Sequence, residues 1–81
     1  MEKGLVVIAK AGKEKNQLFV VVDVIGKYVF LADGKRLKLS KPKKKSVKHV
    51  QKASTKKFPI QDLLIKDEKI NAEIRNFLKN L

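Results

Sequence analysis

The feature that most constrains this 81-residue chain is the run Leu-Phe-Val-Val-Val-Asp-Val-Ile at residues 18–25, in which Asp23 is the only polar residue. A short run rich in β-branched residues predicts a strand, and its near-continuous apolar character predicts burial on both faces. A chain of this length forms one small domain, which buries only about 60% of the surface that is exposed on unfolding. A strand buried on both faces in so small a domain indicates a tightly curved sheet.

Short apolar runs at residues 5–9 and 28–32 predict strands before and after this central one. Gly26 and Lys27 form a two-residue connection with glycine first, which suits a type II′ hairpin turn. Asp33 and Gly34 are a typical type I′ pair, so we expect a positive φ at Gly34. The first turn predicts that residues 28–32 pair with the central strand, and the second predicts a further hairpin after residues 28–32.

The basic middle of the chain is harder to assign. Residues 36–39 alternate, which predicts a fourth strand with Arg36 and Lys38 on one face and two leucines on the other. Pro42 excludes a central strand at residues 40–45, which we expect to form a basic loop. Residues 47–50 are a weak candidate for a short fifth strand, and residues 52–57 are expected to form a second basic loop.

The end of the chain has helical periodicity. Its apolar residues recur at spacings of three and four, which predicts an amphipathic helix, with Asp67 or Asn71 as the N-cap and an irregular or helical turn at residues 60–65. These apolar residues are Ile70, Ile74, Phe77, Leu78 and Leu81. The predicted fold is mainly β: a small SH3-like barrel of four to five strands at residues 1–58, with a C-terminal segment at 59–81 whose helix packs on the barrel.

Almost all of the net charge lies in one segment. Eleven basic residues and no acidic one occur between Lys35 and Lys57, whereas the whole chain has a net charge of +12. The other residues therefore carry a net charge of only +1, so the basic segment 35–57 dominates the surface field and attracts polyanions. The alternative is a solvated lysine face that keeps a small protein soluble.

Several classes of function lack the residues that they need. The chain has no cysteine and only one histidine, His49, so no metal site, disulfide or thiol chemistry is expected. It shows neither a phosphate-binding glycine motif nor paired catalytic carboxylates, and we expect no enzyme activity, cofactor or small-molecule substrate. The apolar runs are too short for a signal peptide or a membrane span, so we expect a cytoplasmic protein without a membrane partner.

The stretch at residues 4–25 resembles a KOW motif, in which a strand enters a glycine-centred basic loop, here Ala-Gly-Lys-Glu-Lys at 11–15, and continues into an aliphatic strand. With the basic stretches at 32–37, 41–45 and 48–50, the chain is similar to bacterial KOW-domain RNA-binding proteins, which are related to archaeal and eukaryotic large-subunit ribosomal proteins of the L-fourteen-e type. The resemblance to this family also extends to residues 71–75, Asn-Ala-Glu-Ile-Arg. Asn16 and Gln17 stand where such loops commonly carry a second glycine, and Asn tolerates the left-handed conformation.

The resemblance implies an SH3-like barrel that binds large-subunit ribosomal RNA, with ribosomal proteins as further partners. Glycine lets backbone N–H groups approach a phosphate closely, and lysine supplies a compact charge suited to phosphates. The predicted RNA-binding residues are Gly12, Lys13, Lys15, Arg36, Lys38, Lys41, Lys43, Lys44, Lys45, Lys48 and His49. Two alternatives remain: a KOW-type module for nascent RNA or a transcription or translation partner, and a protein-interaction module with a solvated lysine face.

Overall fold

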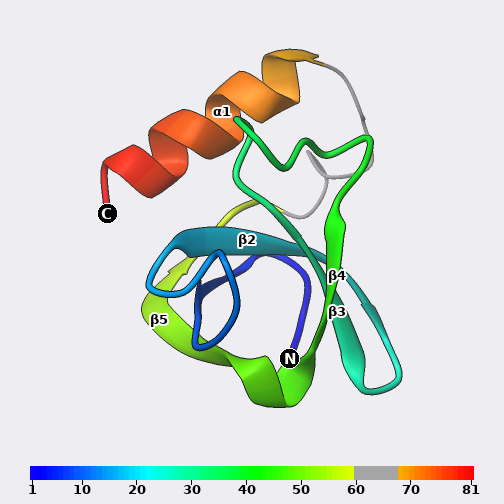
Figure 1. Ribbon diagram of the computed structural model, residues 1–81. Coiled ribbons are helices and arrows are strands. Elements are labelled where there is room, and N and C mark those ends of the chain that lie inside the picture. The colour runs from blue at the N-terminus through cyan, green and yellow to red at the C-terminus, as the bar shows by residue number, and fades with distance from the viewer. Residues whose placement is uncertain (60–67) are drawn as a thin grey trace.

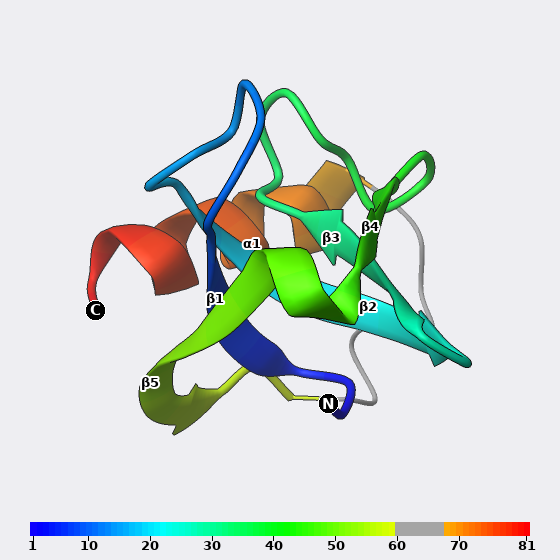
Figure 2. The same ribbon diagram turned by 60° about the horizontal axis from the view of Figure 1, so that its bottom comes forward.

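The computed structural model describes residues 1–59 and 68–81, and its five strands form one antiparallel sheet in the order β4-β3-β2-β1-β5 (Figure 1). The strands are β1 (Leu5–Ala9), β2 (Leu18–Ile25), β3 (Tyr28–Ala32), β4 (Lys43–Ser46) and β5 (Val50–Lys57). A 3₁₀-helix, η1 (Val47–His49), joins β4 directly to β5, so the two edges of the sheet curl toward one another (Figure 2). The sheet is a small SH3-like barrel with a C-terminal helix, which confirms the predicted fold class.

Residues 19–22 of β2 are buried on both faces, as the apolar run predicts, whereas Ile25 at the end of the strand is exposed. Phe19 and Val21 point into the barrel interior, where they join residues of β1, β3 and β5. Val20 and Val22 point to the outer face and pack against α1 (Glu68–Lys79), which lies above β2 in Figure 1. The protein therefore has two hydrophobic clusters, one inside the barrel and one between the barrel and α1.

The tight turn between β2 and β3 matches its prediction. Ile25 pairs with Tyr28 across the connection, and Gly26 has a φ of 60°. Lys27 has no positive φ, and a type II′ turn requires a positive φ only at its first central residue. The β2–β3 hairpin therefore closes through the glycine that the sequence indicated.

The predicted fourth strand at residues 36–39 is wrong, because other partners take the backbone groups that a strand would use. Asp33 Oδ1 accepts the N–H groups of Lys35 and Leu37, and the Leu37 carbonyl accepts the N–H groups of Asp33 and Gly34. Gly34 has the expected positive φ of 79°, but Asp33 does not, so the turn is not type I′. Leu37 packs against the barrel interior, whereas Leu39 is buried under α1.

The lysine-rich stretches contain the two strands that the sequence did not indicate. Residues 43–45, expected to be loop, belong to β4, which pairs with β3. Residues 52–57, expected to be a second loop, belong to β5, which pairs with β1. Residues 47–49, a candidate strand, form η1 instead. Both strands lie at sheet edges, where lysines hinder unwanted pairing with other chains. The sequence pattern therefore did not predict β4 and β5, because they contain few apolar residues and form by pairing with β3 and β1.

The amphipathic pattern correctly predicts α1, which begins at Glu68. Asn71 lies inside the first turns and is buried, so it is not the N-cap. The other cap candidate, Asp67, and the segment 60–65 lie outside the described residues. Among the helices of the described residues, none is both long and apolar enough to cross a membrane.

Candidate nucleic-acid interface

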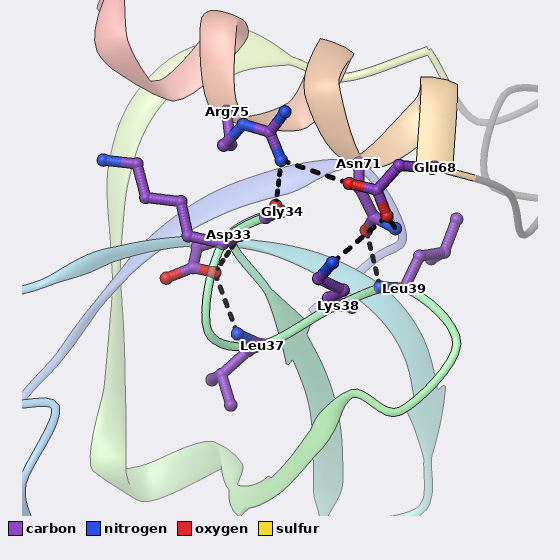
Figure 3. A network of polar contacts seen from close by, with 9 residues as sticks. Asp33, Gly34, Leu37, Lys38, Leu39, Glu68, Asn71 and Arg75 are labelled. Atoms are coloured by element: carbon purple, nitrogen blue, oxygen red, sulfur yellow. Dashed lines mark hydrogen bonds and ion pairs between the residues drawn. The ribbon is translucent and has the colours of Figure 1, made fainter.

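The first part of the basic segment is held against α1 by polar contacts (Figure 3). The Leu39 N–H donates to Asn71 Oδ1 over 2.8 Å, and the Arg75 guanidinium donates to the Gly34 carbonyl. The first of these bonds is buried, so it stabilises more than a solvent-exposed hydrogen bond would. The helix therefore fixes the backbone from which the basic side chains of residues 35–38 extend.

An open hollow of about 510 Å³, here called the Lys41 hollow, lies along residues 36–43. Leu37 and Pro42 contribute apolar surface, and the lining contains no acidic side chain among the described residues. Its cations are Arg36, Lys38, Lys41 and Lys43. A concave surface lined by one sign of charge focuses the electric field, so this hollow attracts anions. Four of the predicted RNA-binding residues are thus brought together.

Two of these cations also contact carboxylates outside the hollow. Lys38 Nζ lies 3.2 Å from Glu68 Oε2, and their side chains are 47% and 63% exposed. The hydrogen bond from Lys38 lowers the pKa of the Glu68 carboxyl below its ordinary value. Solvent screens an ion pair between exposed side chains, so Lys38 can exchange this carboxylate for a phosphate at little cost. Within the described part of the chain, no ion pair engages Arg36 or Lys41.

Strand alternation separates the three consecutive lysines of β4. Lys43 and Lys45 point to the loop 10–17, where their Nζ atoms lie 3.2 and 3.3 Å from Glu14 Oε1. Lys45 Nζ also donates to the Ala11 carbonyl over 2.9 Å. The Lys45 and Glu14 side chains are only 11% and 15% exposed, and Lys45 is the one predicted RNA-binding lysine that is not exposed. Its contacts tie the loop to the barrel.

Replacing Lys45 with glutamine should therefore destabilise the fold, whereas the same change at Lys44 should not. The Lys45→Gln variant loses the bond to Ala11 and leaves the largely buried Glu14 with Lys43 alone. We expect the free energy of unfolding to fall by about 2 kcal/mol. Lys44→Gln should change it by about 0.5 kcal/mol. Urea denaturation of both variants measures the difference, and equal midpoints would contradict the structural role of Lys45.

The same ion pairs predict acid sensitivity. Burial alone would raise the pKa of the Glu14 carboxyl, but hydrogen bonds from Lys43 and Lys45 outweigh it and hold the pKa below the ordinary value of 4.5. In acid the unfolded chain therefore binds a proton at Glu14 before the folded protein does, and stability falls as the pH drops below about 4.5. Thermal melts between neutral pH and pH 3 should show a smaller decrease for Glu14→Gln than for the unmodified protein. An identical decrease would mean that Glu14 does not contribute.

The glycine-centred loop lies beside β4. Gly12 has a φ of 82°, and a Cβ built on it would lie 3.1 Å from Lys45 Nζ. Asn16 has a φ of 71°, so asparagine adopts a left-handed conformation that few residues other than glycine tolerate. Lys13 and Lys15 are exposed on the same loop. The structure thus brings the predicted loop contacts next to the basic strand.

The remaining predicted residues lie on the adjoining surface. Lys48 and His49 are exposed on η1, and the His49 carbonyl accepts the Lys10 N–H over 2.8 Å. Lys44 Nζ lies 4.2 Å from the centroid of the Tyr28 ring, a cation–π contact at the end of the β2–β3 hairpin. None of these residues lines the Lys41 hollow.

Sequence reasoning left out three cations, Lys35, Arg75 and Lys79, which lie with Arg36 around a second hollow. Arg75 and Lys79 are four residues apart on α1 and so share one helix face, which is the signal that was available. The acidic residues Glu68 and Glu73 earlier on the same helix made the local charge look balanced. Within residues 1–59 and 68–81, no group of three or more His, Asp or Glu side chains could hold a metal ion. Comparison with models of protein families and with curated proteins gives no match to this chain.

Proposed function

We propose that this chain is a non-enzymatic RNA-binding protein whose main contact surface is the Lys41 hollow and the cations around it. The observation that carries this proposal is a concave surface with four cations and, in the described part of the chain, no acidic lining residue. Solubility alone requires neither a concave arrangement nor the exclusion of acids. A polyanion fits such a surface better than a single small anion, because further exposed lysines continue beyond it.

Lysine predominates on this surface, which favours phosphate contacts over the reading of bases. Lys41 and Lys44 offer compact, mobile charges, and Arg36 is the only arginine in the basic segment. Tyr28 is the one exposed aromatic residue of the described chain, and Lys44 lies over its ring. The described residues therefore lack the row of exposed aromatic side chains on which a sheet stacks successive bases. The surface suits the phosphates of folded RNA instead.

The resemblance to KOW-domain proteins supports large-subunit ribosomal RNA as the ligand and the cytoplasm as the compartment. A tagged form of the full chain, sedimented with ribosomes and followed by sequencing of the bound RNA, tests this proposal. Recovery of large-subunit RNA is the expected result. Recovery of messenger RNA instead would replace the ribosomal assignment with a nascent-RNA module. Recovery of a protein partner without RNA would overturn RNA binding.

Binding should depend strongly on salt. If about five phosphates are neutralised, the logarithm of the affinity should fall against the logarithm of the salt concentration with a slope of roughly −3.5 to −4.5. Fluorescence anisotropy with a labelled ribosomal RNA fragment at several salt concentrations measures this slope. An affinity that hardly changes across the series would contradict a surface that contacts phosphates.

A further inference from the structure

A second open hollow, here called the Lys79 hollow, lies where the turn 33–37, the loop 10–17 and α1 meet. Its volume is also about 510 Å³. The barrel contributes Lys35 and Arg36 to its lining, and α1 contributes Arg75 and Lys79. Four cations from two separate parts of the chain thus surround one concave surface.

The carboxylate at this hollow is already engaged. Asp33 Oδ1 accepts the backbone N–H groups of Lys35 and Leu37, at 2.8 and 3.0 Å. Arg75 holds the Gly34 carbonyl, and its Nη1 lies 3.5 Å from Glu68 Oε1. Lys35 and Lys79 form no ion pair with any of the described residues. The hollow therefore retains a net positive charge that an incoming anion can neutralise.

The other lining residues suit a phosphate of a nucleic acid. Asn16 and Gln17 present exposed amide groups, which can donate hydrogen bonds to phosphate or ribose oxygens. Leu18 and Leu78 add apolar surface, and nearby apolar surface lowers the local dielectric and strengthens the attraction between lysine and phosphate. Arg36 lines both the Lys41 hollow and this one, so the two hollows share one arginine.

We propose that the Lys79 hollow is a second phosphate-binding site, so that one RNA backbone runs from the Lys41 hollow past Arg36 onto α1. This inference rests on the proposed RNA binding and adds Lys35 and Lys79 as contact residues. Arg75 acts as a positioning residue, because it holds the turn that carries Lys35 and Arg36. The bound RNA then bridges the barrel and the helix.

The test compares two double variants that remove the same charge from the same kinds of element. Lys35→Gln/Lys79→Gln changes one barrel lysine and one α1 lysine at the hollow, and Lys27→Gln/Lys69→Gln changes one of each away from it. All four side chains are exposed, so thermal melts of both variants should match the unmodified protein. The ligand is the same labelled ribosomal RNA fragment as in the salt series above, and anisotropy measures its affinity at several salt concentrations.

Loss of two phosphate contacts should weaken binding by the hollow variant about 25-fold at about 0.1 M salt and reduce the magnitude of the salt slope by about 1.4. In the control variant, RNA binding should be weaker by less than about threefold, because only the long-range attraction from the protein's net charge is reduced. Equal losses from the two variants would overturn the Lys79 hollow as a site while leaving RNA binding intact. Failure of the unmodified protein to bind RNA would overturn the proposed function together with this inference.

Discussion

Replacing Gly34 with alanine should lower the free energy of unfolding by about 3 kcal/mol, because two penalties add. Gly34 has a φ of 79°, a left-handed conformation that alanine adopts at a cost of about 1–2 kcal/mol. The added Cβ would also lie 2.1 Å from the Asn71 carbonyl oxygen, so α1 would have to move away from the barrel. The melting temperature should fall by about 15 °C.

Gly26→Ala is the matched control. Gly26 has a φ of 60°, but a Cβ built there has no neighbour within 4 Å. This variant should show only the conformational penalty, about 1–2 kcal/mol. The difference between the two variants therefore measures the contact between the turn and the helix. Equal destabilisation would mean that α1 does not press against Gly34.

Removal of the cations at and beside the Lys41 hollow should weaken RNA binding about 100-fold at about 0.1 M salt, if each of three replaced residues contacts one phosphate. The variant is Arg36→Gln/Lys41→Gln/Lys44→Gln. None of these three exposed residues forms an ion pair among the described residues, so their replacement leaves no carboxylate without its partner. Lys43 and Lys45 are left unchanged because their bonds to Glu14 stabilise the fold.

The control for total charge is Lys52→Gln/Lys56→Gln/Lys69→Gln, with two lysines on β5 and one on α1. These three side chains are exposed, and β5 lies at the edge of the sheet opposite β4. Anisotropy with the same labelled RNA should show much weaker binding for the first triple variant only, with both proteins folded. If the two triples weaken binding to the same extent, total charge rather than the Lys41 hollow determines affinity.

The elements that the sequence predicted correctly are those whose apolar residues repeat with a regular period. The run at β2 indicated burial on both faces, and Val20 and Val21 do lie in different clusters. Gly26 marked the hairpin, and Ile70 and Ile74 marked the buried stripe of α1. In each case the local pattern and the tertiary contacts favour the same structure, so the pattern alone was sufficient.

The errors fall where side-chain pattern and backbone hydrogen bonding disagree. Residues 36–39 alternate like a strand, but Asp33 and Asn71 accept the N–H groups of Leu37 and Leu39. Residues 43–46 are mostly lysine, yet they pair with β3 because β3 otherwise has an unpaired edge. Strand pairing depends on which backbone lies alongside, and no local pattern records this.

The sequence by itself determined strands β1, β2 and β3, the helix and the position of the charge, because these follow from residue types and their spacing. Only the tertiary structure decided which cations are exposed and which are held by carboxylate or carbonyl oxygens. Lys44 and Lys45 are neighbours in the sequence, yet Lys44 is exposed and Lys45 is held by Glu14 and Ala11 from a distant loop. Arg75 likewise reaches Gly34 from the far end of the chain. The electrostatic environment of a side chain depends on contacts between distant segments, so it is determined only when the chain has folded.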